Sequence, residues 1–353
     1  MNMATIVIND SSYDAWDAFV STHPDGTIYH TSSWKRILQN TFRHIEPCFT
    51  AIEENGVIVA GMPFYVVRSK ILGNSIISIP FANISNPLVS TPGQFDALFD
   101  TVRKYADENR LKKIIMHSVG AEPYWQNADI LSHITDKHHF IPVSEEPAKL
   151  LKRFHRGSVR QHIRKIDSSG VVLEDADDIS SVDIFFSIFV QARKTKGLPP
   201  IPRQFFLSMW EELKPKNRYH VYLVKYENTY VGAGIVLTSK DMVHLDFIAD
   251  CNDYRFCRTS HVIYWEAINL AYREQLSGVS LGRTSVVNQG LLDFKRKWAS
   301  HETDMLTHIY PKQYTGPIQK DQSLKYKMLT AVSKHLPDSV LIELGKVVYN
   351  HIG

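Results

Sequence analysis

One hairpin pattern occurs twice in this chain, and the repeat limits the fold more than any other feature of the sequence. Residues 49–67 read FTAIEENGVIVAGMPFYVV, and residues 222–239 read YLVKYENTYVGAGIVLTS. In both, two runs rich in β-branched and aromatic residues flank a polar turn, which is typical of a β-hairpin. Each hairpin precedes an expected helix and strand: Gln94–Asn109 with Lys112–Ser118, and Ser260–Glu274 with Val279–Leu281. We therefore predict two mixed α/β layer units with a ligand-binding cleft between them.

The length and composition agree with two globular units. The chain has 353 residues, of which 44 % are hydrophobic and 22 % charged, and this balance can form a sizeable core. We predict a first domain over residues 1–148, a second over 149–312 and a C-terminal helical extension over 313–353. The formal net charge of +3 is too small to indicate nucleic acid or membrane binding, so such partners depend on local clusters.

No metal or tightly bound cofactor is expected. The three cysteines, Cys48, Cys251 and Cys257, match no zinc signature, although a bond between Cys251 and Cys257 stays open. The sequence contains no HExxH, GxSxG, GxGxxG or phosphate-loop motif. It shows no signal peptide and no run of about 18 apolar residues. We expect a cytoplasmic protein and leave contact with the inner membrane face open.

A basic segment opens the second half. We predict a helix over Leu150–Ser169, in which Arg153, Arg156, Arg160 and Arg164 follow one another at helical spacing and share a face. Guanidinium groups bind phosphate with two parallel hydrogen bonds, so this face suits a phosphate or RNA. The alternative is a solvated basic face that carboxylates of the other domain neutralise.

A strand near residue 246 carries acidic groups. Alternation along Val243–Asp250 predicts that His244, Asp246 and Asp250 share one face. Asp246 or Asp250 could then take a proton from an amine, and a hydrogen-bonded polar strand is the alternative. Arg258 comes just before the expected helix at Ser260, where a helix N-terminus suits an anion, or forms an ordinary cap.

A polar loop at residues 81–87, FANISNP, follows a short strand in the first half. Asn83, Ser85 and Asn86 could hydrogen-bond a sugar or peptide, with Tyr29 lining the same cleft; alternatively, the loop satisfies its own turns.

The segment Gly278–Trp298 ends an apolar strand at Gly282 and then presents polar groups. Arg283, Thr284 and Ser285 follow the glycine, and Lys295 comes after a further polar loop. Two cations at the end of a strand suit an anionic ligand or a developing negative charge. The alternative is a strand, a turn and a solvated basic segment.

Together these motifs resemble the FemAB-type aminoacyltransferases, especially the FemAB-related proteins of bacterial exopolysaccharide and cell-envelope systems. The likeness extends from about Thr27 to Tyr310. It rests on the basic segment, on QARKTKGLPPIPRQFF at 191–206, and on GRTS at 282–285 followed by GLLDFKRKW at 290–298.

The resemblance implies an α/β (α+β) fold of two tandem GNAT-like domains, each a mixed, mostly antiparallel sheet flanked by helices, plus a helical tail. It implies an acyltransferase that moves an aminoacyl or other activated acyl group to an amine of a peptidoglycan or exopolysaccharide precursor. By position, Lys295 matches the lysine at the acyl-transfer centre, Arg283 the GR arginine, and Arg156 with Arg160 the basic motif.

The partners that it implies are a glycan or peptide precursor and a donor, either aminoacyl-tRNA or acyl-coenzyme A. The segment DCNDYRFCRTS at 250–260 contains no glycine, whereas acetyltransferases of this fold use glycine there for the coenzyme A pyrophosphate. Two alternatives stay open: an acyl-coenzyme A N-acyltransferase acting on an amino sugar, and a non-catalytic glycan-binding or scaffold protein.

Overall fold

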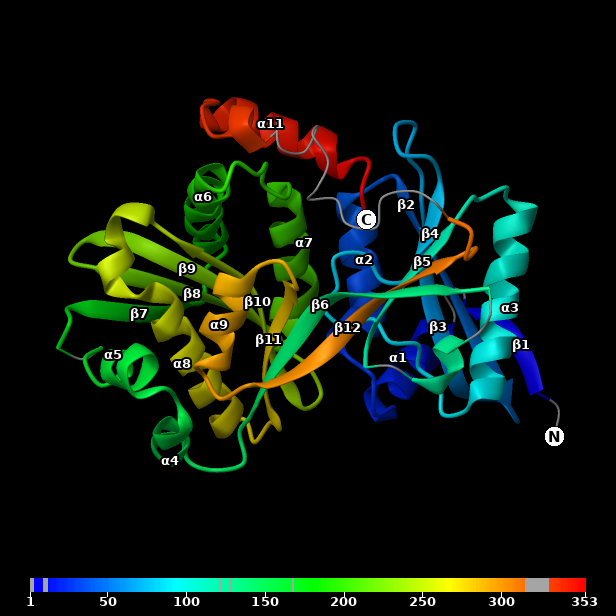
Figure 1. The fold of residues 1–353 in the computed structure, drawn as a ribbon, viewed down its shortest axis with the longest axis horizontal. Helices are drawn as coiled ribbons and strands as arrows, with labels where there is room; N and C mark the ends of the chain where they lie inside the picture. Colours follow the sequence, from blue (N-terminus) through cyan, green and yellow to red (C-terminus); the bar gives the residue numbers. More distant parts are fainter. Residues whose placement is uncertain (1–2, 9–11, 121, 127–128, 167, 315–329) are drawn as a thin grey trace. The chain divides into compact units, whose positions relative to one another are not determined.

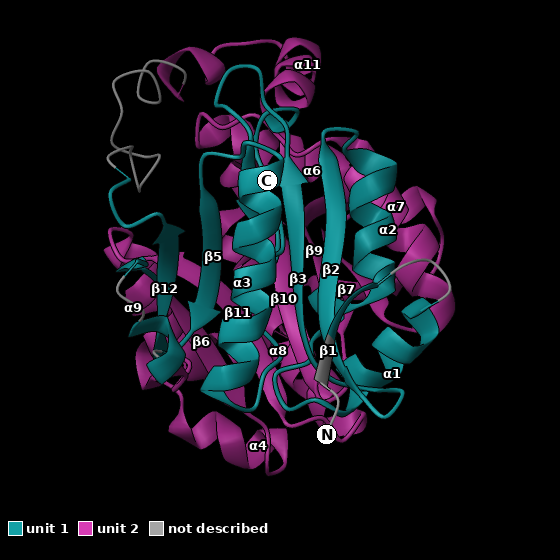
Figure 2. Cartoon of the chain, turned by 90° about the vertical axis from the view of Figure 1, so that its right-hand side faces the viewer, with its two compact units in different colours: residues 1–136, 303–317, 349–353 teal, residues 137–302, 318–348 magenta. Residues whose placement is uncertain are grey.

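A computed structural model describes the chain except for residues 1–2, 9–11, 121, 127–128, 167 and 315–329 (Figure 1). The chain forms two compact units (Figure 2). Unit 1 comprises residues 1–136, 303–317 and 349–353, and unit 2 comprises residues 137–302 and 318–348. The chain passes into unit 2 within strand β6 (Leu131–Pro142), earlier than the expected boundary after residue 148, and returns within β12 (His301–Tyr310).

Unit 1 is a mixed sheet that helices cover. Its strand order is β1-β2-β3-β4-β5-β12, and all neighbouring pairs are antiparallel except β4 with β5. The strands other than β12 are β1 (Met3–Ile8), β2 (Ile45–Glu54), β3 (Val57–Val67), β4 (Ser75–Ile77) and β5 (Ile114–Val119). The helices are α1 (Tyr13–Thr22), η2 (Ile28–His30), α2 (Ser32–Thr41), α3 (Pro92–Glu108) and η3 (Pro123–Gln126).

Helix α3 forms as the sequence predicts, because its apolar residues recur at helical spacing. Thr91 caps its first turn by accepting from the Gln94 amide, and the Gln94 side chain bonds back to Thr91. Phe95, Leu98 and Phe99 are buried against the sheet, so this helix supplies much of the unit 1 core.

Unit 2 repeats this plan. Its strand order is β6-β11-β10-β9-β8-β7, in which β10 and β11 run parallel. The remaining strands are β7 (Val171–Ala176), β8 (Tyr219–Tyr226), β9 (Thr229–Thr238), β10 (Met242–Asp250) and β11 (Gly278–Ser285). The longer helices are α6 (Ser180–Thr195), α7 (Arg203–Leu213), α8 (Thr259–Arg273), α9 (Gln289–Arg296) and α11 (Asp338–Tyr349), and short turns are η6 (Lys214–Lys216) and η7 (Asn252–Cys257).

Two cores lie on opposite faces of the unit 2 sheet. Helix α8 packs on one face, where a β-carbon on Gly234 of β9 would meet Ile263. On the other face, Phe247 of β10 contacts the rings of Phe189 in α6 and Phe206 in α7. The order β2-β3-β4-α3-β5 in unit 1 recurs as β8-β9-β10-α8-β11 in unit 2, which confirms the predicted fold class and internal repeat.

The predicted continuous helix over Leu150–Ser169 is wrong. The chain instead forms short pieces: α4 (Pro147–Leu150), η4 (Leu151–Arg153), η5 (Arg156–Arg160) and α5 (Gln161–Ile163). Phe154 is extended, with ψ of 155°, and its ring packs on Trp298 at a centroid distance of 5.3 Å. The next amide, on His155, donates to the Lys297 carbonyl at 2.9 Å. These tertiary contacts override the local helical pattern.

Three further expectations concern residues 121–144, the cysteines and the C-terminal tail. Residues 121–144 lack a regular sequence pattern and are therefore expected to be irregular; this expectation is wrong, because Leu131–Pro142 form β6. The cysteines are free thiols, so Cys251 and Cys257 are not bonded. The tail forms α11 after Pro337 as predicted, and its predicted part within 323–329 lies outside the described residues. No described helix is both long and apolar enough to cross a membrane.

Candidate functional site

The two parallel strands of unit 2 separate soon after they meet. Strands β10 and β11 pair only at Met242–Gly278, Val243–Val279 and His244–Ser280, yet both continue well beyond the last pair. We call the stretch beyond His244 and Ser280 the fork. Two diverging parallel strands offer their facing edges to an extended ligand, as in recognition by strand addition.

Lys295 holds one arm of the fork. Its ammonium donates to the carbonyls of Gly282 and Arg283 at 3.0 and 3.4 Å, and the residue is 3 % exposed. Gly282 has φ of +67°, which favours glycine. The sequence predicted that the strand ends at Gly282; instead β11 bends there and continues to Ser285. In this continuation Arg283 is exposed, Thr284 is buried and Ser285 is half-buried.

A β-bulge changes the predicted face of β10. His244 pairs with Leu237 and Leu245 with Val236, but Phe247 pairs with Ile235, so Asp246 is the extra residue. The bulge reverses the alternation, and Asp250, opposite Gly232, therefore points to the other face from His244. The prediction that His244, Asp246 and Asp250 share a face is wrong. Asp246 is half-buried and lies just past the last β10–β11 pair.

A row of buried polar groups crosses the base of the fork. The His138 Nε2 atom of β6 lies 2.8 Å from Ser280 Oγ, which accepts from the Gly282 amide at 3.3 Å. His244, the β10 partner of Ser280, bonds Ser239 through Nε2 at 2.9 Å. Burial lowers the pKa of both histidines to about 3, and for His138 the positive Lys295 adds to the effect. Both rings are thus neutral at physiological pH.

Sequence reasoning missed this row. His138 and Ser280 are 142 residues apart, and β6 was not recognised as a strand. The run LSHITDKHHFIP does not alternate between polar and apolar residues, so its pattern carries no clear strand signal that could have found them.

Two basic stretches far apart in the sequence meet at the N-terminus of α8. The His261 Nε2 atom donates to the Ser158 carbonyl of η5 at 2.8 Å, and the His261 ring lies 5.2 Å from the His162 ring. Burial, with smaller effects of His162 and Arg258, lowers the pKa of His261 to about 4, although its hydrogen bond to Ser158 opposes the shift. The structure therefore brings Arg258 close to the segment that carries Arg156, Arg160 and Arg164. Among the described residues, none of these four arginines forms an ion pair, and Arg160 Nε is buried without a hydrogen-bond partner.

A carboxylate lies at the first turn of α8. The hydroxyls of Thr259 and Ser260 both donate to Asp250, the latter at 2.9 Å. Arg258 adopts the left-handed conformation, with φ of 52°, just before the helix. The positive end of the helix dipole favours a negative group at the first turn, and Asp250 is that group.

In unit 1, the place that corresponds to the fork lies beyond the last pair of β4 and β5, and side chains of the loop after β4 occupy it. Strands β4 and β5 pair only at Ile76–Ile114 and Ile77–Ile115. Beyond them, Ser78 Oγ accepts from the His117 amide at 3.2 Å and Ser85 Oγ donates to the His117 carbonyl at 3.1 Å.

Asn86 also bonds this edge of β5, and we call Ser78, Ser85 and Asn86 together the plug. Its side chain bonds both the amide and the carbonyl of Val119, at 2.8 and 3.1 Å. A cavity of only about 10 Å³ remains beside Ser78, Ser85 and Asn86, less than one water needs. The side chains proposed as ligand groups at 85–86 therefore replace a neighbouring strand.

The other predicted groups of unit 1 lie together. Asn83 donates to the Tyr29 hydroxyl at 3.4 Å. Tyr29 is fully buried and packs edge-on against Trp34, with 4.9 Å between the ring centroids, so both rings belong to the core.

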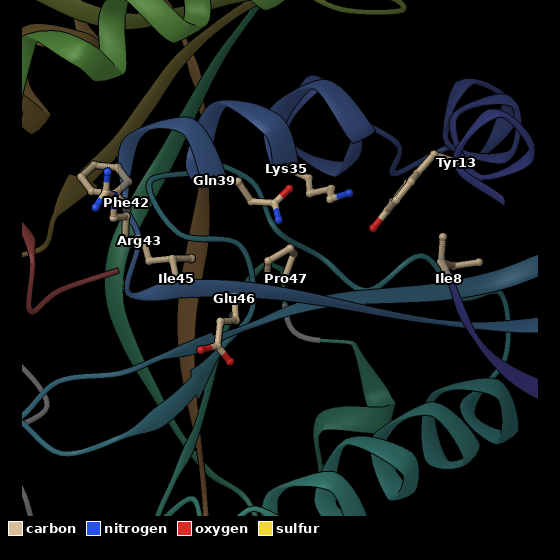
Figure 3. A pocket seen from close by; sticks show the side chains of 9 residues that line it. All are labelled: Ile8, Tyr13, Lys35, Gln39, Phe42, Arg43, Ile45, Glu46 and Pro47. Carbon is tan, nitrogen blue, oxygen red and sulfur yellow. The ribbon is translucent and has the colours of Figure 1, made fainter. Parts of the chain in front are cut away.

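A separate pocket of about 480 Å³ lies in unit 1 between α2 and β2 (Figure 3). Figure 3 shows Lys35 and Gln39 facing it from α2, and the Lys35 ammonium lies 3.9 Å from the centroid of the Tyr13 ring. None of the predicted site residues lines this pocket.

Comparison with known proteins agrees with this geometry. Residues 153–296 match the family described as an acetyltransferase (GNAT) domain, and this segment contains the whole fork. No curated protein sequence matches the chain significantly.

Solved structures share the fold over most of the chain. FemX is similar with a TM-score of 0.71 and 12 % identity, covering 86 % of this chain and 96 % of its own. A tandem GNAT protein from the clavulanic acid biosynthesis pathway has a TM-score of 0.55 at 10 % identity, covering 90 % of this chain and 100 % of that one. The C-terminal domain of a putative lysylphosphatidylglycerol synthetase from Agrobacterium fabrum has a TM-score of 0.55 at 10 % identity, covering 92 % and 97 %. Identities this low show a common fold.

Proposed function

We propose that this chain, an acyltransferase with the tandem GNAT fold of FemAB-type proteins, transfers an aminoacyl or other activated acyl group to an amine of a cell-envelope glycan or peptide precursor. One observation carries the proposal: within the segment that matches the GNAT domain, β10 and β11 separate after three residue pairs. An extended acyl-bearing arm fits such edges because it can use their backbone groups as a further strand would.

The reaction is attack of an amine nitrogen on the acyl carbonyl carbon. A C–N bond forms, and the C–O or C–S bond to the donor breaks. We assign Asp246 the role of general base for the amine proton, because it is the bulged residue just past the last pair of the fork. The leaving oxygen or sulfur takes up a proton as it departs.

Lys295 supports the developing negative charge. Its hydrogen bonds to Gly282 and Arg283 fix the β11 edge, and its positive charge lies beside the fork, where a dry setting strengthens its effect on an oxyanion. Arg283, Thr284 and Ser285, on the same arm, are proposed to contact the substrate.

The basic cluster around Arg160 and Arg258 is proposed to bind phosphate groups of the donor or of a nucleotide-linked acceptor. Arg156 and Arg164 extend it. Asp250 occupies the α8 N-terminus, where a coenzyme A pyrophosphate would meet a like charge. This favours an aminoacyl donor over acyl-coenzyme A.

Unit 1 is proposed to bind the acceptor. Its own strand divergence is filled by Ser78, Ser85 and Asn86, whereas Asn83 is half-buried and the buried Tyr29 hydroxyl accepts from its side chain. We propose that Asn83 contacts the acceptor and that Tyr29 positions Asn83. An acyl-coenzyme A N-acyltransferase is the second candidate, because the GNAT domain match favours that donor.

Transfer assays separate these possibilities. The purified chain is incubated with charged tRNA or acetyl-coenzyme A and with nucleotide-linked muropeptide or amino sugar, and products are read by mass. We expect transfer from charged tRNA, a large loss of kcat in Asp246→Asn, and little change in the control Asp241→Asn, whose carboxylate is exposed at the other end of the same strand. Product only with acetyl-coenzyme A would select the second candidate. No product with any donor, or equal rates in both variants, would contradict catalysis at the fork.

A further inference from the structure

The loop between β3 and β4 presents two large aliphatic side chains to solvent. Ile71 is 72 % exposed and Leu72 is 53 % exposed. The loop, Arg68–Asn74, projects beyond the ends of the neighbouring strands of unit 1 (Figure 1). Exposed apolar side chains at the tip of a projecting loop are typical of a contact surface.

The exposure is built into the loop. The hydroxyl of the buried Ser69 accepts from the amides of Ile71 and Leu72 at 3.3 and 2.9 Å. The Ser69 amide donates to Asn74 Oδ1 at 3.1 Å, and Gly73 turns the chain with φ of +78°. The backbone is therefore held in a shape that keeps both side chains outward.

Basic side chains lie at the same end of the unit 1 sheet as this tip. Strand register places the starts of β2 and β5, the end of α3 and the residues after β12 at the same end of the unit 1 sheet. The basic residues there are Arg43, Arg68, Lys70, Arg110, Lys112, Lys113 and Lys312.

Few carboxylates oppose them. The acidic side chains at this end are Glu46, Asp107 and Glu108, and Glu46 forms an ion pair with Arg68 at 2.6 Å. Seven basic against three acidic side chains leave this end positive, although the whole chain carries a formal charge of only +3.

We propose that Ile71 and Leu72 dock unit 1 onto a membrane surface with anionic lipid headgroups. The two aliphatic side chains enter the interface, and the surrounding lysines and arginines face the headgroups, a pairing of short apolar insertion with a basic rim that gives reversible binding. The basic rim favours a lipid surface over a second copy of the chain, whose like charges would repel. This inference stands apart from the acyl transfer proposed above.

The opposite end of the same hairpin supplies a matched control. Val57 is 63 % exposed beside the β2–β3 turn, next to Glu53 and Glu54. It shares the exposed apolar character of the tip, but its neighbours are acidic, so it should not contact anionic lipid.

Vesicle sedimentation of the full chain tests the proposal. We expect binding to vesicles of equimolar phosphatidylglycerol and phosphatidylcholine, weaker binding to pure phosphatidylcholine, and weakening with added salt. Ile71→Ser with Leu72→Ser should lower the partition coefficient about tenfold or more, because each loses insertable apolar surface. Val57→Ser should bind like the wild type. Both side chains are exposed, so circular dichroism should show folded protein in each case.

Several results would overturn the proposal. These are no binding to phosphatidylglycerol vesicles, equal binding by the Ile71/Leu72 double variant, or equal loss in Val57→Ser. An oligomer in lipid-free solution that the double variant dissociates would assign the tip to a second copy instead.

Discussion

Replacing Lys295 by methionine tests whether its ammonium holds the fork. Methionine keeps much of the buried stem but removes both hydrogen bonds, to the Gly282 carbonyl at 3.0 Å and the Arg283 carbonyl at 3.4 Å. A hydrogen bond from a charged group contributes about 1.5–3 kcal/mol, and the longer one contributes less. The variant also no longer buries the Lys295 charge, and avoiding that desolvation cost offsets part of the lost stability. We expect Lys295→Met to lower the free energy of unfolding by about 2 kcal/mol at pH 7.5.

The same change should matter less in acid. Burial and the positive Lys295 together lower the pKa of His138, so removing the ammonium raises that pKa toward its unfolded value. The native state then resists protonation less. Because burial, the larger cause of the shift, remains, the deficit of Lys295→Met should shrink by only about 0.3 kcal/mol at pH 4.

Urea unfolding followed by circular dichroism at both pH values measures these effects. Lys297→Met is the matched control, because Lys297 is exposed two residues away, and its variant should stay within about 0.5 kcal/mol of the wild type. Equal midpoints for the two variants at pH 7.5 would refute the supporting role, and a deficit at pH 4 that is equal to or larger than that at pH 7.5 would refute the electrostatic link to His138.

Three further predictions concern backbone, plug and acid stability. Gly282→Ala should cost about 1–2 kcal/mol because φ is +67°, whereas Gly290→Ala, in α9 with open space around the new β-carbon, should be neutral or stabilising in the same urea assay; a smaller cost at 282 than at 290 would contradict this. Asn86→Ala should cost about 2 kcal/mol by removing both bonds to Val119, and an unchanged thermal midpoint would count against the plug. His138 and His244 have pKa values lowered from 6.5 to about 3, so their contribution is complete above pH 6.5 and falls as pH drops toward 3, by about 2 kcal/mol each at pH 5; stability that is flat between pH 7 and 5 would exclude it.

Much of the fold could be predicted because it follows from local patterns. The two hairpins, α3 and α8 each carry their own periodicity and turn residues, so no distant contact is needed to recognise them.

The predictions fail where contacts between residues far apart in the sequence determine the local structure. The basic segment breaks at Phe154 because that ring packs on Trp298, which lies 144 residues later. The face of β10 is reversed by a single bulged residue, Asp246, and alternation alone cannot reveal a bulge. Ser85 and Asn86 have the composition of a ligand loop, yet they bond the β5 edge, which was the alternative that the sequence left open.

The plug in unit 1 bears on stoichiometry. A duplicated chain whose halves had both kept an open divergence would accommodate two donor molecules. Here Ser78, Ser85 and Asn86 imitate the missing strand in one half, so calorimetric titration should saturate at one equivalent of donor. Under the proposed function, one half of the duplicated chain therefore hosts the activated group, and the other half is left for a different task.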